Sequence, residues 1–120
     1  MYSSSNFESD LINSYAWDTA IVFIQEFSGD TEYSRQSRLQ SSLAKCGEAT
    51  DGTNNDVRCN IYDMAGNTRE WSTETVPNTD FPCVPRGGVY DDSIYYTRHR
   101  GSSYTTDSDS IYSARPTLYL

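Results

Sequence analysis

The single histidine of the sequence lies in a short basic cluster, and it is the first residue at which catalysis can be considered. The cluster consists of Arg98, His99 and Arg100. A histidine can act as a general base near neutral pH, but it needs a proton donor of the reaction within hydrogen-bond reach. Neither a Gly-x-Ser-x-Gly motif nor a paired-acid motif accompanies His99. We therefore predict that His99 is a surface contact or a hydrogen-bonded polar residue, and not a catalytic base.

The three cysteines offer a second chemistry, either a disulfide or a set of thiols. Because their number is odd, they cannot all pair within one chain. Cys46 and Cys59 flank a polar loop, and a bridge there would close about 14 residues and add up to about 3 kcal/mol of stability. The alternative is three reduced thiols, and the sequence leaves the two open. Without a Cys-x-x-Cys motif or a His/Cys cluster, the sequence predicts no zinc site.

The most biased part of the sequence is the stretch from Val89 to Ser113. Tyr, Ser, Asp and Thr fill 18 of its 25 positions. Antibody binding loops use the same residue types, because Tyr gives a large amphipathic contact and the small polar residues give adaptable hydrogen bonds. The alternative is an edge hairpin with solvated loops, since Tyr and Thr also favour strands and Ser and Asp favour loops. On the binding interpretation, the candidate contact residues are Tyr90, Asp91, Asp92, Tyr95, Tyr96, Arg98, His99, Arg100, Ser102, Tyr104 and Asp107.

Charge and hydropathy exclude several classes of partner. The formal net charge is −8, with a single lysine, so the sequence lacks the basic clusters that a nucleic acid or an anionic membrane requires. No apolar run approaches the roughly 20 residues of a membrane span, and no signal peptide is visible at the N-terminus. Apolar residues make up only 36% of the chain. We therefore expect a small core that depends on the aromatic residues Trp17, Phe23, Phe27 and Trp71 and on several of the ten tyrosines.

Apolar spacing predicts one helix, over residues 14–28. Asn13 or Ser14 can cap its start and Gly29 can end it. The inward face carries Trp17, Ile21 and Ile24. Residues 1–10 are expected to be a loose lead-in.

The remaining chain predicts strands and loops. Residues 69–75 alternate as a strand with Trp71 on its inner face, after a turn at Ala65–Asn67. Residues 34–45 are compatible with a short helix. Three prolines over 76–86 predict a loop that leads into a strand at Val89–Tyr90. The end of the chain, 115–120, predicts a final strand in which Leu118 and Leu120 share a face.

Two fragments carry a family resemblance. They are "IYDMAGNTREW" (Ile61 to Trp71) and "VPRGGVY" (Val84 to Tyr90), followed by the terminal "ARPTLYL". Together they resemble the formylglycine-generating, or sulfatase-modifying, enzyme family over about half of the chain. The resemblance implies an α+β fold: a single compact domain over 1–120 of the C-type lectin type, with a small twisted antiparallel sheet, one or two helices and long loops. Gly66 and the Gly87–Gly88 pair suit sites of positive φ or of close backbone approach.

The chemistry of that family does not carry over residue by residue. Its two catalytic cysteines would fall at about Asp92 and Thr97, and no cysteine follows Cys83. We therefore predict that the protein is not an enzyme. The family's calcium site would fall on the side chains of Asp63 and Glu70 and the carbonyl groups of Gly66 and Thr68. The alternative is that Asp63 caps the turn and Glu70 pairs with an arginine.

The Tyr-rich stretch resembles one subgroup of lectin-fold proteins more closely, the variable proteins of diversity-generating retroelements. In them, mutation of template adenines converts Asn codons into Tyr, Asp, Ser, Thr, Ile and His, and the stretch from Val89 to Ser113 contains these residues and no Asn. The resemblance implies a variable ligand-binding face at residues 86–116. It further implies a protein or glycan receptor as partner and display on a phage tail or a cell surface. Displayed binders of this kind often oligomerise, and the sequence leaves the oligomeric state open. The alternatives are a fixed-specificity adhesin or carbohydrate-binding domain, and an enzyme of the same family with altered chemistry.

Overall fold

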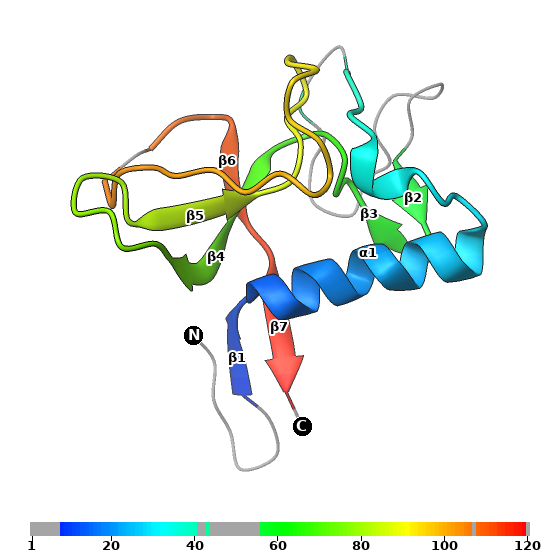
Figure 1. The fold of residues 1–120 in the computed structure, drawn as a ribbon, viewed down its shortest axis with the longest axis horizontal. Helices are drawn as coiled ribbons and strands as arrows, with labels where there is room; N and C mark the ends of the chain where they lie inside the picture. Colours follow the sequence, from blue (N-terminus) through cyan, green and yellow to red (C-terminus); the bar gives the residue numbers. More distant parts are fainter. Residues whose placement is uncertain (1–7, 41–42, 44–55, 107, 120) are drawn as a thin grey trace.

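One helix and three small sheets form the part of the chain that the computed structural model describes, residues 8–40, 43, 56–106 and 108–119 (Figure 1). This is an α+β arrangement, as predicted. A two-stranded antiparallel sheet pairs β1 with β7, a second one pairs β2 with β3, and a three-stranded sheet has the order β5-β4-β6. The elements are β1 (Glu8–Leu11), α1 (Ser14–Ser28), the 3-10 helix η1 (Tyr33–Arg35), β2 (Val57–Arg58), β3 (Ile61–Tyr62), β4 (Arg69–Thr75), β5 (Cys83–Arg86), β6 (Tyr112–Ala114) and β7 (Pro116–Tyr119).

The helix α1 confirms the prediction from apolar spacing. Asn13 caps it, because its side-chain oxygen accepts a hydrogen bond from the Ala16 amide at 2.8 Å, and Gly29 ends it at a φ of 74°. The predicted inward face, Trp17, Ile21 and Ile24, is buried. Within the described residues, no helix combines the length and the apolar character needed to cross a membrane.

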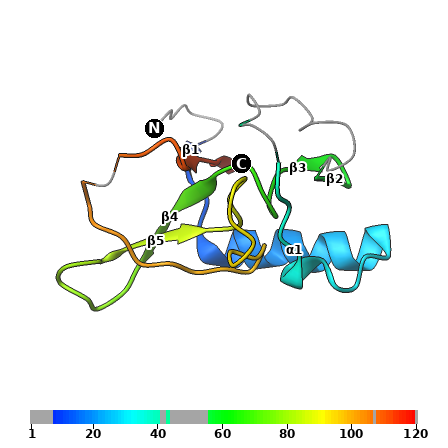
Figure 2. The same cartoon turned by 90° about the horizontal axis from the view of Figure 1, so that it is seen from above.

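The predicted aromatic core is wrong in part. Phe23 is 41% exposed and Phe27 is 74% exposed. Their rings contact each other in a tilted arrangement, with 4.6 Å between the ring centroids. Neither phenylalanine belongs to the core cluster, to which α1, drawn in blue in Figure 2, contributes Trp17, Ile21 and Ile24. The core also contains Ile12, Met64, Ala65 and the buried Tyr33, which confirms that a tyrosine contributes to it.

The prediction of a loose lead-in over residues 1–10 is wrong for its described part, residues 8–10. Residues 8–11 form β1, which pairs antiparallel with the C-terminal β7, with Glu8 opposite Tyr119 and Leu11 opposite Pro116 (Figure 1). The predicted final strand is confirmed over β7 (Pro116–Tyr119). The shared face of Leu118 and Leu120 stays a prediction, because Leu120 lies outside the described residues. Because a strand of four residues gains its stability from its partner, nothing local in residues 8–11 indicated a strand. Residues 1–7 lie outside the described part.

The three-stranded sheet confirms the strand over residues 69–75 and corrects the orientation of Trp71. Glu70 and Ser72 are buried, whereas Trp71 is only half-buried. The interior of this sheet accepts polar side chains because they are bonded there: the Ser72 hydroxyl donates to the Val84 carbonyl at 2.7 Å.

The proline-rich connection contains a strand that the sequence did not indicate. β5 (Cys83–Arg86) pairs antiparallel with β4 although it includes Pro85, which is tolerated because β5 lies at an edge of the sheet. The strand expected at Val89–Tyr90 is absent, and Val89 makes only an isolated bridge with Asp92.

Two other local predictions have different outcomes. The short helix expected over 34–45 is reduced to the single turn η1 at 33–35; residues 41–42 and 44–45 lie outside the described part. The glycine pair is confirmed as a close-approach site. Gly87 has a φ of 87°, and a Cβ added at Gly88 would overlap the carbonyl oxygen of Ala65.

Candidate functional site

The Tyr-rich segment (residues 89–113) is fixed to the core at its middle by Thr97, which is fully buried. The indole nitrogen of Trp17 donates a hydrogen bond to the Thr97 carbonyl at 3.0 Å. The Thr97 amide and hydroxyl both donate to the Gln36 carbonyl, at 2.9 and 3.1 Å. The buried face of α1 therefore holds the backbone of this segment in place.

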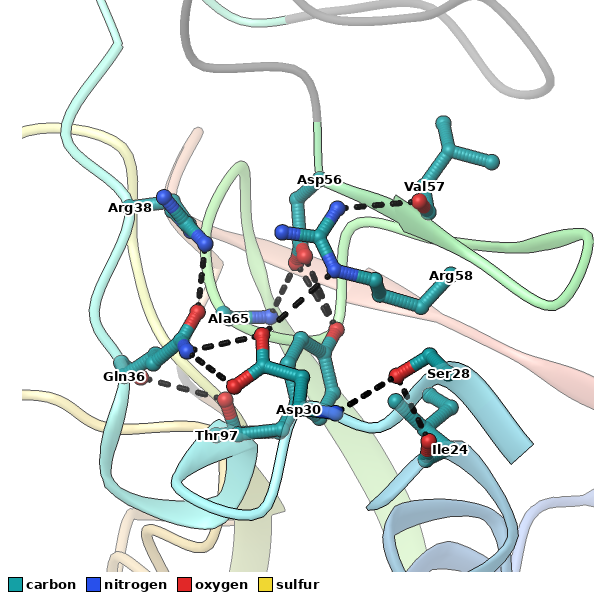
Figure 3. Close-up of polar contacts among 11 residues, drawn as sticks. Ile24, Ser28, Asp30, Gln36, Arg38, Asp56, Val57, Arg58, Ala65 and Thr97 are labelled. Atoms are coloured by element: carbon teal, nitrogen blue, oxygen red, sulfur yellow. Dashed lines mark hydrogen bonds and ion pairs between the residues drawn. The ribbon is translucent and has the colours of Figure 1, made fainter. Parts of the chain in front are cut away.

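A polar network behind Gln36 supports this attachment (Figure 3). The side-chain amide nitrogen Nε2 of Gln36 donates to both carboxylate oxygens of Asp30, at 2.7 and 2.8 Å. Arg58 pairs with the same carboxylate at 3.5 Å. Nearby, the buried Asp56 accepts hydrogen bonds from the Ala65 amide at 2.6 Å and from the Tyr33 hydroxyl at 2.9 Å. Since buried polar groups are stable only when bonded, this network fixes the position of the chain at residues 30–38.

The edge strand β5 provides a second attachment. The Gly87 amide donates to the His99 carbonyl at 3.2 Å, and the Gly101 amide donates to the Pro85 carbonyl at 2.9 Å. Further along, Ser103 exchanges two backbone hydrogen bonds with Cys83. The described part of the segment therefore follows β5 and does not pair with itself as a regular hairpin. The choice between a binding face and a plain structural segment stays a prediction.

Between these attachments, the predicted contact residues are accessible to solvent. Tyr96 is 42% exposed and Tyr104 is 49% exposed. Four others are exposed, namely Asp91, Arg98, Arg100 and Ser102. Another four are half-buried, namely Tyr90, Asp92, Tyr95 and His99, and Asp107 lies outside the described residues.

The structure brings two of the half-buried residues, Tyr95 and His99, into an aromatic cluster that also includes residues from β4 and β6. His99 contacts Tyr95 edge-on, at 4.8 Å between ring centroids. The guanidinium group of Arg69 lies 4.7 Å from the ring centroid of Tyr95 and 5.5 Å from that of Tyr112. Tyr112 in turn stacks on Trp71 at 4.7 Å. We call these five residues, Arg69, Trp71, Tyr95, His99 and Tyr112, the aromatic face.

Sequence reasoning missed Arg69, Trp71 and Tyr112 as members of this face. Arg69 and Trp71 are two residues apart on β4 and both contact Tyr112, the partner of Arg69 in the parallel register of β4 and β6. Their period of two was a usable signal for a shared face, but the parallel pairing with β6 was not visible in the sequence. Tyr104 lies apart from this cluster and packs on Phe81, at 4.3 Å between ring centroids.

His99 does not add a charge to the aromatic face at neutral pH. Burial lowers the pKa of His99, and the nearby positive charges of Arg69 and Arg86 lower it further. A neutral imidazole can donate one hydrogen bond and accept another, which suits a ligand contact.

A pocket of about 450 Å³ contains most of the residues of the expected calcium site. Both carboxylate oxygens of Glu70 accept hydrogen bonds from Arg115, at 2.6 and 2.7 Å. Burial raises the pKa of Glu70, and the charge of Arg115 opposes that shift. The alternative in which Glu70 pairs with an arginine is therefore confirmed. This donor set does not fit a calcium ion, because a guanidinium group occupies the carboxylate oxygens that the cation would need.

The described residues also contain no group of three or more His, Cys, Asp or Glu side chains that could hold a metal ion. Cys59 is exposed and Cys83 is half-buried, and neither forms a disulfide with another described residue. Cys46 lies outside the described part, so the choice between a Cys46–Cys59 bridge and reduced thiols stays a prediction.

Comparisons of this chain with protein-family models, with curated protein sequences and with solved structures found no match.

Proposed function

We propose that the protein is a non-enzymatic binding module whose Tyr-rich segment is a diversified receptor-binding surface on a lectin-type scaffold. The fold assignment and the retroelement origin depend on the sequence resemblance of "DMAGN", "RGG" and the Asn-free segment. On this proposal the domain is displayed on a phage tail or a cell surface, and its partner is a protein or glycan receptor.

The observation that carries the proposal is the contrast between backbone and side chains in the segment. The backbone is bonded to the core at Thr97, Gly101 and Ser103, whereas Tyr96 and Tyr104 extend into solvent. A surface of this kind tolerates side-chain exchange, because the exchanged atoms contribute little to the core. Exposed tyrosines then supply the large contact area and small polar residues the hydrogen bonds.

A substitution experiment tests this contrast before any ligand is known. Replacing Tyr96, Ser102 and Tyr104 together by other products of adenine mutation should change the free energy of unfolding by less than about 1 kcal/mol in total. Thr97→Val, which removes the hydroxyl bond to Gln36, should alone cost about 1 kcal/mol. If the triple exchange unfolds the domain, the side chains are structural and the proposal is wrong.

Binding is tested on a panel of purified glycans and surface proteins. The same triple variant should lose a binding partner that the wild type retains, while Val22→Ser on the exposed side of α1 (58% exposed) should keep it. A near-identical copy of the 3′ coding region that differs at adenines would support diversification. Retained binding without such a copy would favour a fixed-specificity adhesin or carbohydrate-binding domain.

A further inference from the structure

Arg69 is a buried cation that has no acidic partner among the residues that the structure describes. Its residue is only 6% exposed, and its Nε makes no hydrogen bond. Its one hydrogen bond to a side chain is a long contact, 3.5 Å, from Nη1 to the Tyr112 hydroxyl. Burying a charge is unfavourable unless it is paired, so the arrangement of Arg69 needs an explanation.

The other buried arginine of the described part, Arg86, and the half-buried Arg115 are paired with carboxylates. Arg86 contacts Asp18 and Glu74, and Arg115 contacts Glu70. Arg69 has instead the faces of two aromatic rings, Tyr95 and Tyr112. Two ring faces offset part of the desolvation of a guanidinium group, but they leave its planar edge with unused donors.

The surroundings of Arg69 allow a ligand group to reach those donors. Tyr95, whose ring the guanidinium group faces, and His99, which contacts Tyr95 edge-on, are half-buried and belong to a stretch without regular strand or helix. A change of side-chain rotamer there breaks no sheet hydrogen bond. On its other side the guanidinium group packs against the backbone of Gly101, where an added Cβ would overlap Nη2. The backbone of β4 and of Gly101 therefore holds the cation in place, and the side chains that can move away from it are those of Tyr95 and His99.

We propose that Arg69 binds a carboxylate of the ligand, supplied by an Asp or Glu side chain of a protein receptor. The inference rests on the proposed function, since it assigns a ligand class to the aromatic face. The planar guanidinium fork matches a carboxylate in a bidentate geometry, and the low-polarity site strengthens the pair. A protein source is favoured because rigid tyrosines among small polar residues are typical of surfaces that recognise proteins.

The acidic net charge of the chain does not prevent this contact. Charges more than about 8 Å away are largely screened by salt at physiological ionic strength. At contact distance the ligand interacts with Arg69 and the neutral His99. The net charge of −8, which is a sum over the whole chain, has little effect there.

Nuclear magnetic resonance titration of the whole chain tests the proposal without a known receptor. The probes are N-acetyl-glutamic acid methylamide, its glutamine counterpart and glucuronate. The acid should shift the Arg69 Nε–Hε and Trp71 indole resonances with a dissociation constant about 10- to 100-fold lower than that of the amide. Arg69→Gln should reduce this ratio to about one, whereas Arg35→Gln, at an exposed pair with Glu32, should leave it unchanged.

Each of four results would overturn the inference. Equal response of wild-type Arg69 to the acid and the amide would remove the anion preference. The Arg69→Gln variant could keep the wild-type ratio of the two dissociation constants together with a native near-ultraviolet circular dichroism spectrum. The anion preference would then belong to another residue. Tighter binding of glucuronate than of the glutamyl probe would overturn the protein source. If a receptor from the panel still depends on Tyr96 and Tyr104 but not on Arg69, the proposed function stands and only this inference fails.

Discussion

Removing one hydroxyl from the core should destabilise the protein measurably, because that hydroxyl donates a hydrogen bond to a buried carboxylate. Tyr33 and Asp56 are both fully buried. The Tyr33 hydroxyl lies 2.9 and 3.1 Å from the two carboxylate oxygens of Asp56 (Figure 3). In Tyr33→Phe the packing is retained, and the carboxylate keeps the Ala65 amide as its remaining close donor.

The expected loss is that of a hydrogen bond to a charged group, about 1.5–3 kcal/mol. For a chain of 120 residues this corresponds to a decrease of about 6–12 °C in the melting temperature. Urea denaturation at pH 7 measures the free energy directly. The matched control is Tyr15→Phe, since the Tyr15 side chain is 88% exposed and its loss should stay below about 0.5 kcal/mol.

The pH dependence of this loss separates a charge effect from a packing effect. Burial raises the pKa of Asp56 above its ordinary value, and the Tyr33 hydrogen bond partly opposes that shift. A raised folded-state pKa means that Asp56 favours folding most when protonated, and that this contribution is lost as the pH rises through the folded pKa. The variant should therefore differ most from the wild type at neutral pH and least in acid. A loss below 0.5 kcal/mol at pH 7, or a loss that does not change with pH, would refute the reasoning.

Two further perturbations test the scaffold. Gly88→Ala should cost about 2–3 kcal/mol in thermal unfolding, because its Cβ would overlap the backbone of Ala65; a melting temperature equal to that of the wild type would contradict the close approach. Glu70→Gln, which leaves the half-buried Arg115 without its carboxylate, should cost about 3–5 kcal/mol. Glu32→Gln, which removes an exposed pair, should cost less than about 0.5 kcal/mol, and equal losses in the two Gln variants would show that burial does not matter at Glu70.

The candidate binding segment was predictable in part, because composition and exposure are related. A stretch of tyrosines and small polar residues lacks the aliphatic side chains needed for a core, so the exposure of Tyr96 and Tyr104 follows from residue types. The contact of Tyr95 with Arg69 does not, since Arg69 lies on β4, far away in the sequence.

Polar side chains in the interior also limited the prediction of which face of the strand over residues 69–75 is buried. Alternation in residues 69–75 was correctly assigned to a strand, but the phase was chosen by hydrophobicity and placed Trp71 inside. The structure buries Glu70 and Ser72 there, because Arg115 and the Val84 carbonyl bond to them. A polar side chain becomes compatible with a core only through a partner, and no partner is visible from the strand itself.

The sequence alone determined the helix α1, its asparagine cap, the glycine at its end and the close approach at the glycine pair. These features depend on residues within a few positions of each other, whose backbone preferences act locally. Only the tertiary structure decided the pairing of β1 with β7, the parallel contact of β6 with β4 and the assembly of Arg69 with Tyr95 and Tyr112. Those contacts join residues far apart in the chain, and their energy exists only once the whole fold has brought the partners together.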